Sequence, residues 1–368
     1  MTHRTIPGDE PVRVVLAGAG SMGRAWLSTI SLAPDVELAG VADIDVGAAR
    51  SAVAGSGHPA IPVGTDAVAL ATTVGADAVV DATVPQAHHP VTTAALFAGL
   101  AVLGEKPVAA TLAQALSLAA AAEVTGELFM VSQSRRWNPQ LFALQAMAGD
   151  LGAIGTLTTE FFRAPRFGGF REEMDHPLLL DMAIHPFDSA RFVLGAEPVA
   201  AYCEAYNPPW SWYAGAASAT AVFEMEGGVR YIYVGSWCSP GAETSWNGVW
   251  RVSGEKGTAR WDGDGEPVLD ADVQPVRRSP APYSGIAGAL QVFVDALRTG
   301  ATPMGEVHEN VPSLAMVEAA VRSADGGGRV LIDDVLQQAH EKALREETRA
   351  DVRAALAGWT SVRHALTA

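Results

Sequence analysis

Cysteine is scarce in this sequence of 368 residues, which contains only Cys203 and Cys238. Two cysteines cannot form a disulfide framework, and without histidines at ligand spacing they do not make a zinc site. One bridge between them would still be compatible with the sequence. We expect instead two reduced thiols in a cytosolic protein, and no metal site.

Positive charge and long apolar runs are also in short supply. The chain has 25 Lys and Arg against 41 Asp and Glu, a formal net charge of −16, whereas binding to nucleic acids or anionic membranes requires clustered positive charge. Gly, Asp and Pro interrupt every apolar stretch before it reaches the roughly 18 residues of a membrane span. The N-terminal segment lacks the apolar core of a signal peptide. We therefore expect a soluble, cytoplasmic protein that binds neither nucleic acid nor membrane.

The first third of the chain alternates short apolar runs with Ala-rich stretches of helical length. Strands that alternate with helices in this way indicate βαβ units around a parallel sheet, and hence an α/β domain over residues 1–133. The predicted strands are 12–17, 36–42, 78–83, 101–103 and 128–132, and the predicted helices are 21–32, 46–54, 89–99 and 111–125.

Beyond residue 150 the pattern changes to β-branched and aromatic runs separated by Gly-rich turns. It predicts about six strands of an open, mostly antiparallel sheet in a second α/β domain over residues 134–335. The runs are 154–162, 199–206, 218–225, 229–237, 249–253 and 258–261. Helical periodicity returns over 286–299 and 311–324, and a charged, Ala-rich helix over 336–356 opens a C-terminal extension, 336–368.

A glycine-rich motif lies between the first predicted strand and the first predicted helix. Gly18 permits a tight turn, Gly20 allows a pyrophosphate to approach the backbone, and Gly23 allows close packing of helix on strand. The helix N-terminus supplies unpaired N–H groups for phosphates. Glycines in a loop are by themselves only turn residues, but this context indicates a dinucleotide site. The segment reads Gly18-Ala19-Gly20-Ser21-Met22-Gly23.

Asp43 follows Gly23 by 20 residues, at the end of the second predicted strand. A carboxylate there would bind the hydroxyl groups of the adenine ribose and repel the 2′-phosphate of NADP. The next residue, Ile44, is placed in the same cofactor site, and no Lys or Arg occurs before Arg50. The sequence therefore favours NAD over NADP. The alternative is that Asp43 is only a turn residue at a strand end.

Two further segments follow predicted strands, at the edge where open α/β sheets bind ligands. A lysine in an apolar setting, such as Lys106, can take part in proton chemistry, although a Glu-Lys pair is also common on surfaces. The segments are Thr83-Val84-Pro85-Gln86-Ala87-His88 and Gly104-Glu105-Lys106-Pro107. From them we place Thr83, Pro85, His88, Glu105 and Lys106 in the cofactor site.

A third segment, 178–188, carries Asp181, His185 and Asp188. In a helix these side chains share one face, and a histidine flanked by two carboxylates is a candidate acid/base. Pro186 fits only if it falls in the first turn. Two alternatives stay open: a metal pair that lacks a third ligand at helical spacing, or a capped helix with a satisfied histidine.

In this order along the chain, the motifs resemble the Gfo/Idh/MocA oxidoreductase family, which includes glucose–fructose oxidoreductase and inositol dehydrogenases. The resemblance spans about residues 12–335, including Ser134-Arg135-Arg136-Trp137-Asn138-Pro139 and Leu151-Gly152-Ala153-Ile154-Gly155. It implies a Rossmann domain followed by an α/β domain with an open sheet, often used for oligomerisation. It also implies that Lys106 and His185 are the catalytic pair, that Asp181 is a catalytic-site ligand of the substrate, and that the Lys106–Pro107 bond is cis, as it often is in the family.

The region expected around the substrate departs from the family pattern. Where many members have Gly-Gly before the Asp181 segment, this chain has Asp175-His176-Pro177, so no member's substrate can be copied. Tryptophans of the predicted sheet are expected mostly in its core or in a subunit interface. In loops, Trp210 and Trp212 are candidates for stacking on a sugar. The candidate substrate contacts are Arg136, His176, Trp210 and Tyr283.

Together these features predict a dehydrogenase that uses NAD, or less favourably NADP, to oxidise a secondary hydroxyl of a sugar, sugar derivative or cyclitol. His185 would accept the proton and Lys106 would stabilise the alkoxide. The alternatives are a member that recycles tightly bound NAD in glycoside cleavage or epimerisation, and a non-catalytic ligand sensor. A homodimer or homotetramer through the sheet of residues 154–262 is also expected.

Overall fold

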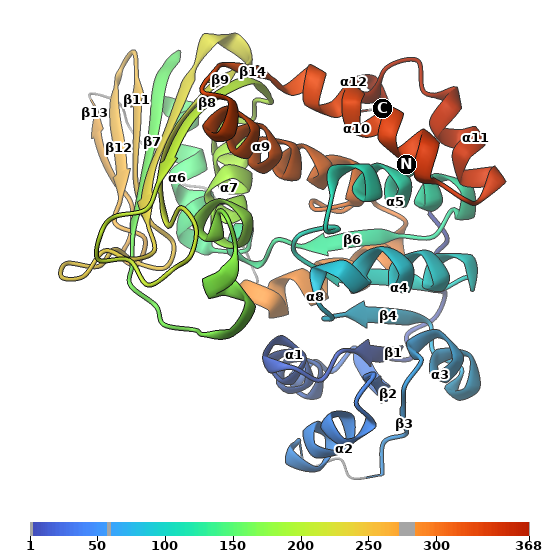
Figure 1. The fold of residues 1–368 in the computed structure, drawn as a ribbon. Helices are drawn as coiled ribbons and strands as arrows, with labels where there is room; N and C mark the ends of the chain where they lie inside the picture. The colour runs from blue at the N-terminus through green and yellow to red at the C-terminus, as the bar shows by residue number, and fades with distance from the viewer. Residues whose placement is uncertain (1–2, 57–59, 272–283, 368) are drawn as a thin grey trace. The chain divides into compact units, whose positions relative to one another are not determined.

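The computed structural model describes residues 3–56, 60–271 and 284–367 (Figure 1). The chain divides into two compact units. The first collects residues 1–134, 283–311 and 337–368, and the second collects residues 135–282 and 312–336. The chain changes unit within α9 (Val307–Gly326) and α10 (Ile332–Glu346). Each unit thus combines segments that are not consecutive in the sequence. The three domains proposed from the sequence, with limits at 133 and 335, are consecutive ranges, and they stay a prediction.

The first unit contains a six-stranded parallel sheet in the order β3-β2-β1-β4-β5-β6. Every residue of its last three strands is buried, as expected for a parallel sheet covered on both faces. The order reverses between β1 and β4, which is where open α/β sheets of this Rossmann type bind ligands. The strands are β1 (Val12–Ala17), β2 (Val36–Ala42), β3 (Val63–Gly64), β4 (Ala78–Asp81), β5 (Ala101–Glu105) and β6 (Phe129–Ser132).

Two groups of helices cover this sheet. One group comprises α1 (Ser21–Leu32), which contacts α2 (Val46–Gly55) and α8 (Gly285–Thr299). In the other, α4 (Pro85–Phe97) contacts α3 (Ala67–Val74) and α5 (Leu112–Thr125). Towards the C-terminus, α11 (Ala350–Gly358) packs against α5, and α12 (Val362–Ala365) follows it. The side chains of Asp45, Asp66 and Thr111 cap the N-termini of α2, α3 and α5.

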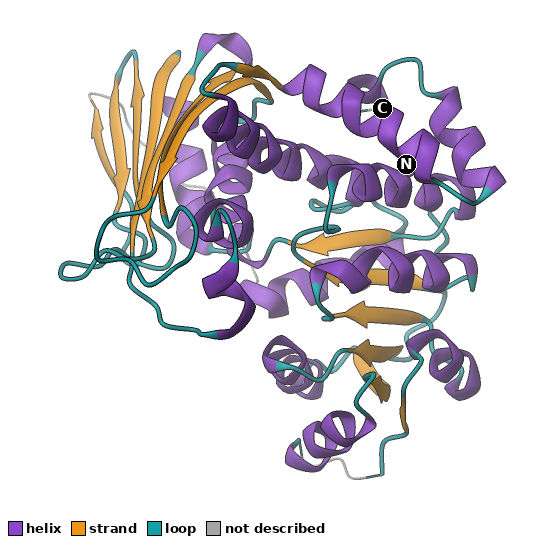
Figure 2. Cartoon of the chain, viewed as in Figure 1, coloured by secondary structure: helices purple, strands orange, loops and turns teal. Residues whose placement is uncertain are grey.

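The second unit contains an eight-stranded sheet in the order β13-β12-β11-β7-β10-β9-β8-β14 (Figures 1 and 2). Only the β7–β10 pair among these neighbours is parallel, so the predicted, mostly antiparallel sheet is confirmed. One face packs on α6 (Pro139–Asp150) and α7 (Ile184–Leu194). The strands are β7 (Ile154–Phe162), β8 (Pro198–Tyr206), β9 (Ser218–Met225), β10 (Arg230–Ser236), β11 (Val249–Gly254), β12 (Gly257–Trp261), β13 (Val268–Ala271) and β14 (Val330–Leu331).

The structure differs from the prediction at several elements, and it contains β3, α3 and α6, which were not predicted. The second sheet has eight strands in the described residues rather than six, because β13 and β14 are too short to carry an alternating pattern. Helix α4 begins at Pro85 instead of 89, since proline at the first helical position lacks only an N–H group that would be unpaired anyway. The single helix predicted over 336–356 is two helices, α10 and α11. At this break Arg349 N donates to Glu347 Oε1 (2.7 Å) and Arg353 Nε donates to Glu347 O (3.0 Å), which satisfies the turn.

The segment around His185 is not one continuous helix. Leu178–Met182 forms a π-helical turn, in which Ala183 N donates to Leu178 O (2.9 Å), and α7 then begins at Ile184. Asp181 therefore belongs to the π turn, whereas His185 and Asp188 belong to α7. Pro186 lies in the first turn of α7, where the sequence requires it to be. Short 3₁₀ turns lie at Ser134–Arg136, where the chain enters the second unit, and within that unit at Gly169–Glu173 and Glu226–Gly228.

Candidate active site

The glycine-rich segment turns sharply at the carboxyl end of β1. Gly18 has φ +93°, and a Cβ atom on it would lie 2.6 Å from Ala82 O. A Cβ atom on Gly23 would lie 2.0 Å from Gly18 O, whereas one on Gly20 would meet no atom within 4 Å. Gly18 and Gly23 are therefore required by the fold of the loop, and Gly20 leaves open space. Gly20 also begins α1 without a side-chain cap, so the first N–H groups of the helix are available to an anion.

Asp43, at the end of β2, is joined to this loop. Its Oδ2 accepts a hydrogen bond from Ala19 N (2.7 Å) and its Oδ1 accepts one from Asp45 N (2.9 Å). These bonds hold the carboxylate beside the Gly-rich turn, which is the position of a ribose-binding carboxylate in a Rossmann site. The adjacent Ile44 side chain is 94% exposed.

The loops after β4 and β5 are connected by His88. Its Nδ1 lies 2.7 Å from Pro107 O and its Nε2 lies 3.2 Å from Thr83 O. The Lys106–Pro107 peptide bond is cis, as the family resemblance implies. Lys106 is thereby placed directly after β5, in a loop that His88 ties to the end of β4.

Glu105 is a core carboxylate of the same edge. It is buried, and its Oε1 accepts a hydrogen bond from Trp26 Nε1 (2.9 Å), so it ties β5 to α1. Burial raises the pKa of Glu105, against the opposing effects of the Trp26 hydrogen bond and the Lys106 charge. Glu105 therefore supports helix α1 from the end of β5 through its bond to Trp26. Its contact with a cofactor stays a prediction.

The proposed cofactor residues of the first unit thus converge at the carboxyl ends of β1, β2, β4 and β5. The open space at Gly20, the uncapped N-terminus of α1 and the Asp43 carboxylate all fit a dinucleotide. The residues at this edge are Gly18, Gly20, Ser21, Met22, Gly23, Asp43, Ile44, Thr83, Pro85, His88, Glu105 and Lys106.

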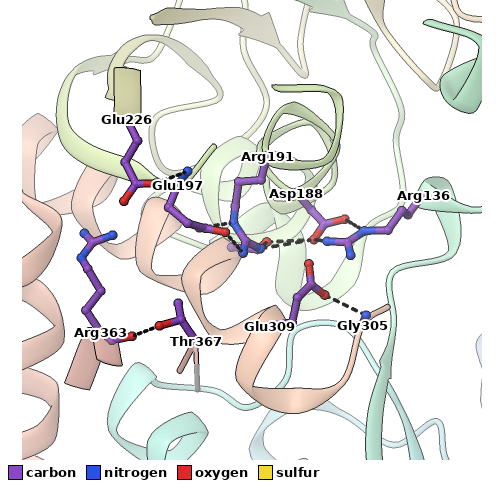
Figure 3. A network of polar contacts seen from close by, with 10 residues as sticks. Arg136, Asp188, Arg191, Glu197, Glu226, Gly305, Glu309, Arg363 and Thr367 are labelled. Atoms are coloured by element: carbon purple, nitrogen blue, oxygen red, sulfur yellow. Dashed lines mark hydrogen bonds and ion pairs between the residues drawn. The ribbon is translucent and has the colours of Figure 1, made fainter. Parts of the chain in front are cut away.

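In the second unit a buried polar network surrounds Asp188 on α7 (Figure 3). Asp188 is 1% exposed, and its carboxylate accepts hydrogen bonds from Arg136 Nε (3.0 Å), Arg136 Nη2 (2.5 Å) and Ser313 Oγ (2.8 Å). Arg191 in turn donates from Nη1 to Ser313 Oγ (2.8 Å) and from Nε to Glu197 Oε2 (2.7 Å). Arg136 is 2% exposed. These contacts make it part of the core, and its predicted contact with a substrate stays untested.

The other predicted residues of the second unit also have defined partners. Asp181 Oδ2 accepts a hydrogen bond from Arg171 Nε (2.6 Å), and His176 Nε2 lies 2.9 Å from Asp325 Oδ1. Trp210 is 63% exposed, with its Nε1 donating to Cys238 O (2.8 Å). Tyr283 lies outside the described residues. The carboxylates predicted on either side of His185 therefore each bind a guanidinium, Asp181 that of Arg171 and Asp188 that of Arg136.

His185, on the first turn of α7, lines a small cavity within the second unit. The space open to the centre of a water molecule is about 10 Å³, enough for about one water-sized group. Among the lining side chains are Arg135, Asn247 and three tryptophans, Trp246, Trp250 and Trp261. Sequence reasoning assigned no role to Arg135, although it stands in the Arg-Arg segment used for the family resemblance.

Within the parts of the chain that the structure describes, no helix has the length and apolar composition needed to cross a bilayer. Cys203 and Cys238 are both buried free thiols, as expected.

This sheet order, with a Gly-rich loop and an acidic residue ending β2, defines an NAD-binding Rossmann oxidoreductase. Residues 12–133 match the oxidoreductase family model with an NAD-binding Rossmann fold, and residues 145–260 match the Gfo/Idh/MocA C-terminal domain. The chain belongs to the Gfo/Idh/MocA family of oxidoreductases, and it is an enzyme with NAD as its cofactor.

Several named proteins are similar to this chain over most of their length. D-apiose dehydrogenase of Paraburkholderia graminis is 29% identical, over 86% of this chain and 88% of its own. Inositol 2-dehydrogenase of Rhizobium meliloti is 28% identical, over 85% of this chain and 96% of its own. An oxidoreductase from Agrobacterium radiobacter, solved with NAD⁺, L-tartaric acid and magnesium, shares the fold at 22% identity and a TM-score of 0.77, covering 87% of this chain and 98% of its own.

Proposed function

We propose that this protein oxidises a secondary hydroxyl group of a sugar, sugar derivative or cyclitol. The names of the relatives, D-apiose dehydrogenase and inositol 2-dehydrogenase, support this class of substrate. The observation that carries the proposal is His185, a buried histidine on the first turn of α7 that lines a cavity. A histidine there is suited to take up a proton from a bound hydroxyl group.

Several residues have distinct roles in the proposed reaction. NAD, when bound at the Gly-rich edge of the first unit, supplies the hydride acceptor. His185 accepts the hydroxyl proton, and the ammonium group of Lys106 stabilises the negative charge that develops on the oxygen. Asp181 binds the substrate, and Arg171 fixes the orientation of that carboxylate through the 2.6 Å bond from its Nε. Lys106 belongs to the first unit and His185 to the second.

The test is single-turnover formation of NADH, after a screen of sugars and polyols for NAD reduction. His185→Ala and Lys106→Met should each lower the rate by about 10²–10⁴-fold, the usual contribution of general acid–base or electrostatic catalysis. NAD affinity should not change in the His185 variant, and the double variant should be far less than multiplicatively worse. Near wild-type rates in both single variants would refute the mechanism.

Two alternative functions predict a different result when the same compounds are screened for NADH formation. An enzyme that recycles bound NAD during glycoside cleavage or epimerisation would convert its substrate without releasing NADH. A ligand sensor would bind its ligand and convert nothing. We favour the dehydrogenase because both Lys106 and His185 are present in the chain.

We also propose the cytoplasm as the compartment, in keeping with the two free thiols. The face of the sheet that bears half-buried Val222 and Ile232 is the proposed interface of a homodimer or homotetramer. Light scattering that gives a monomer of 38.3 kDa at micromolar concentration would refute this assembly.

A further inference from the structure

Two guanidinium groups of the second unit approach the same indole ring. Arg163 Cζ lies 4.4 Å from the centre of the Trp246 ring, and Arg135 Cζ lies 5.8 Å from it. Arg135 also donates to Trp246 O and to Asn247 Oδ1, the latter at 3.3 Å. Stacking on an aromatic face and hydrogen bonding to fixed acceptors hold a guanidinium in one orientation. Arg135 is therefore presented to the cavity that it lines together with His185.

The two arginines differ in how their charge is balanced. Arg163 Nη2 forms an ion pair with Glu243 Oε2 at 2.7 Å, whereas within the described residues Arg135 has no carboxylate partner. Burial, followed by the nearby charge of Arg163, lowers the pKa of Arg135 to about 10. Arg135 thus stays a cation at neutral pH in surroundings that disfavour the cation. An anion bound beside it would relieve this imbalance.

The remaining lining of the cavity fits an anion better than a neutral polyol. No Asp or Glu is among the described residues that line it. A hydroxyl group needs a partner that accepts its proton, and carboxylates are strong acceptors, whereas a carboxylate ligand only accepts hydrogen bonds. The polar lining near His185 comprises Arg135, which only donates, the amide of Asn247, and the hydroxyl groups of Thr159 and Ser189, which can donate to an anion.

We propose that Arg135 binds a carboxylate group of the substrate, so that this enzyme acts on sugar acids rather than on neutral sugars or cyclitols. The inference rests on the proposed dehydrogenase function, which it narrows to one chemical class. Because Arg135 and His185 line the same small cavity, the carboxylate and the hydroxyl group that reacts belong to one small molecule. The oxidation itself is unchanged: the carbinol carbon becomes a ketone, bound NAD would accept its hydride, and His185 takes the hydroxyl proton.

The kinetic test compares acids with their neutral counterparts, D-gluconate with D-glucitol and D-galacturonate with D-galactose, each with NAD. We expect kcat/KM to be at least about tenfold higher for the acid of a pair, the lower end of what a hydrogen bond to a charged group contributes. Arg135→Met should lower kcat/KM for the acid by about ten- to hundredfold, mainly through KM, and should lower it much less for the neutral counterpart. Arg345→Met is the control, because Arg345 is exposed on α10 and belongs neither to the cavity lining nor to the sheet face proposed as the interface.

Calorimetric titration of the protein loaded with NADH measures binding of the same four compounds without turnover. The acids should bind at least about tenfold more tightly than their neutral counterparts, and Arg135→Met should remove the difference. If the acids bind through Arg135 but no compound reduces NAD, the proposed function fails and the carboxylate site stands. If neutral compounds bind and react as well as acids, or if the preference survives in Arg135→Met, the inference is overturned while the dehydrogenase stands. Absence of saturable binding for every acid also overturns it.

Discussion

The ion pair between Arg136 and Asp188 gives a sharp test of what holds the second unit together. Both side chains are almost completely buried, at 2% and 1% exposure. Arg136→Met preserves the length of the side chain and removes its charge, which leaves Asp188 with the Ser313 hydroxyl and with Arg191 Nη1 4.0 Å away. Removing one partner of a buried pair typically costs about 3–5 kcal/mol, because the other charge stays buried without compensation. Because these contacts remain, we expect a loss of about 3 kcal/mol, at the lower end of that range.

Differential scanning calorimetry is the assay, because it can resolve separate transitions of the two units. For a unit of this size each kcal/mol lowers the melting temperature by about 2–4 °C, so the transition should fall by about 6–12 °C. The double variant Arg136→Met/Asp188→Leu should be more stable than Arg136→Met alone, since it has no uncompensated charge. Arg345→Met, at an exposed position of α10, should change little. A loss below about 1 kcal/mol, or a double variant no more stable than the single, would refute the reasoning.

Two further predictions concern the first unit. Burial lowers the pKa of His308, but hydrogen bonds to Glu123 and Glu306 raise it by more, to about 9. A raised pKa contributes stability that is fully present below pH 6.5 and is lost as the pH rises through about 9, so urea unfolding should show a loss of up to about 3 kcal/mol that His308→Gln lacks. In the Gly-rich loop, Gly23→Ala should lower the melting temperature because its Cβ would lie 2.0 Å from Gly18 O. Gly20→Ala should melt like the wild type yet bind NAD at least about tenfold more weakly, and equal NAD affinity in calorimetry would exclude a phosphate at Gly20.

Local sequence signals account for the parts of the fold that were predicted closely. The bounds of β1, α1 and β2 agree with the prediction, because mostly apolar runs form the two strands and the first run leads directly into a glycine turn and a helix start. Strands β13 and β14 carry no such signal: they are four and two residues long, and their place is set by pairing with β12 and β8. The break between α10 and α11 depends on the side chain of Glu347 and could not be predicted from an Ala-rich pattern.

The same distinction applies to the candidate site. The Gly-rich turn and Asp43 belong to one βαβ unit, so their spacing along the chain predicts their proximity. The pairing of Arg163 with Trp246 has no such local origin. Arg163 follows the end of β7 and Trp246 precedes the start of β11, and these strands are neighbours only in the folded sheet. Partners of this kind depend on strand register, which is not visible in a single sequence.

The return of the chain to its first unit has a consequence for biosynthesis. All six strands of the parallel sheet are made before the second unit, whereas α8, which packs on α1, and α11, which packs on α5, are made after most of it. During synthesis of the second unit, the apolar surfaces of α1 and α5 that α8 and α11 later cover therefore stay exposed. Exposed apolar surfaces of this kind favour aggregation or chaperone binding. The contacts that complete the nucleotide-binding half also close long loops, which makes them late and slow steps of folding. Translation of the last helices, rather than of the Gly-rich motif, sets the moment at which the cofactor-binding half of the enzyme is finished.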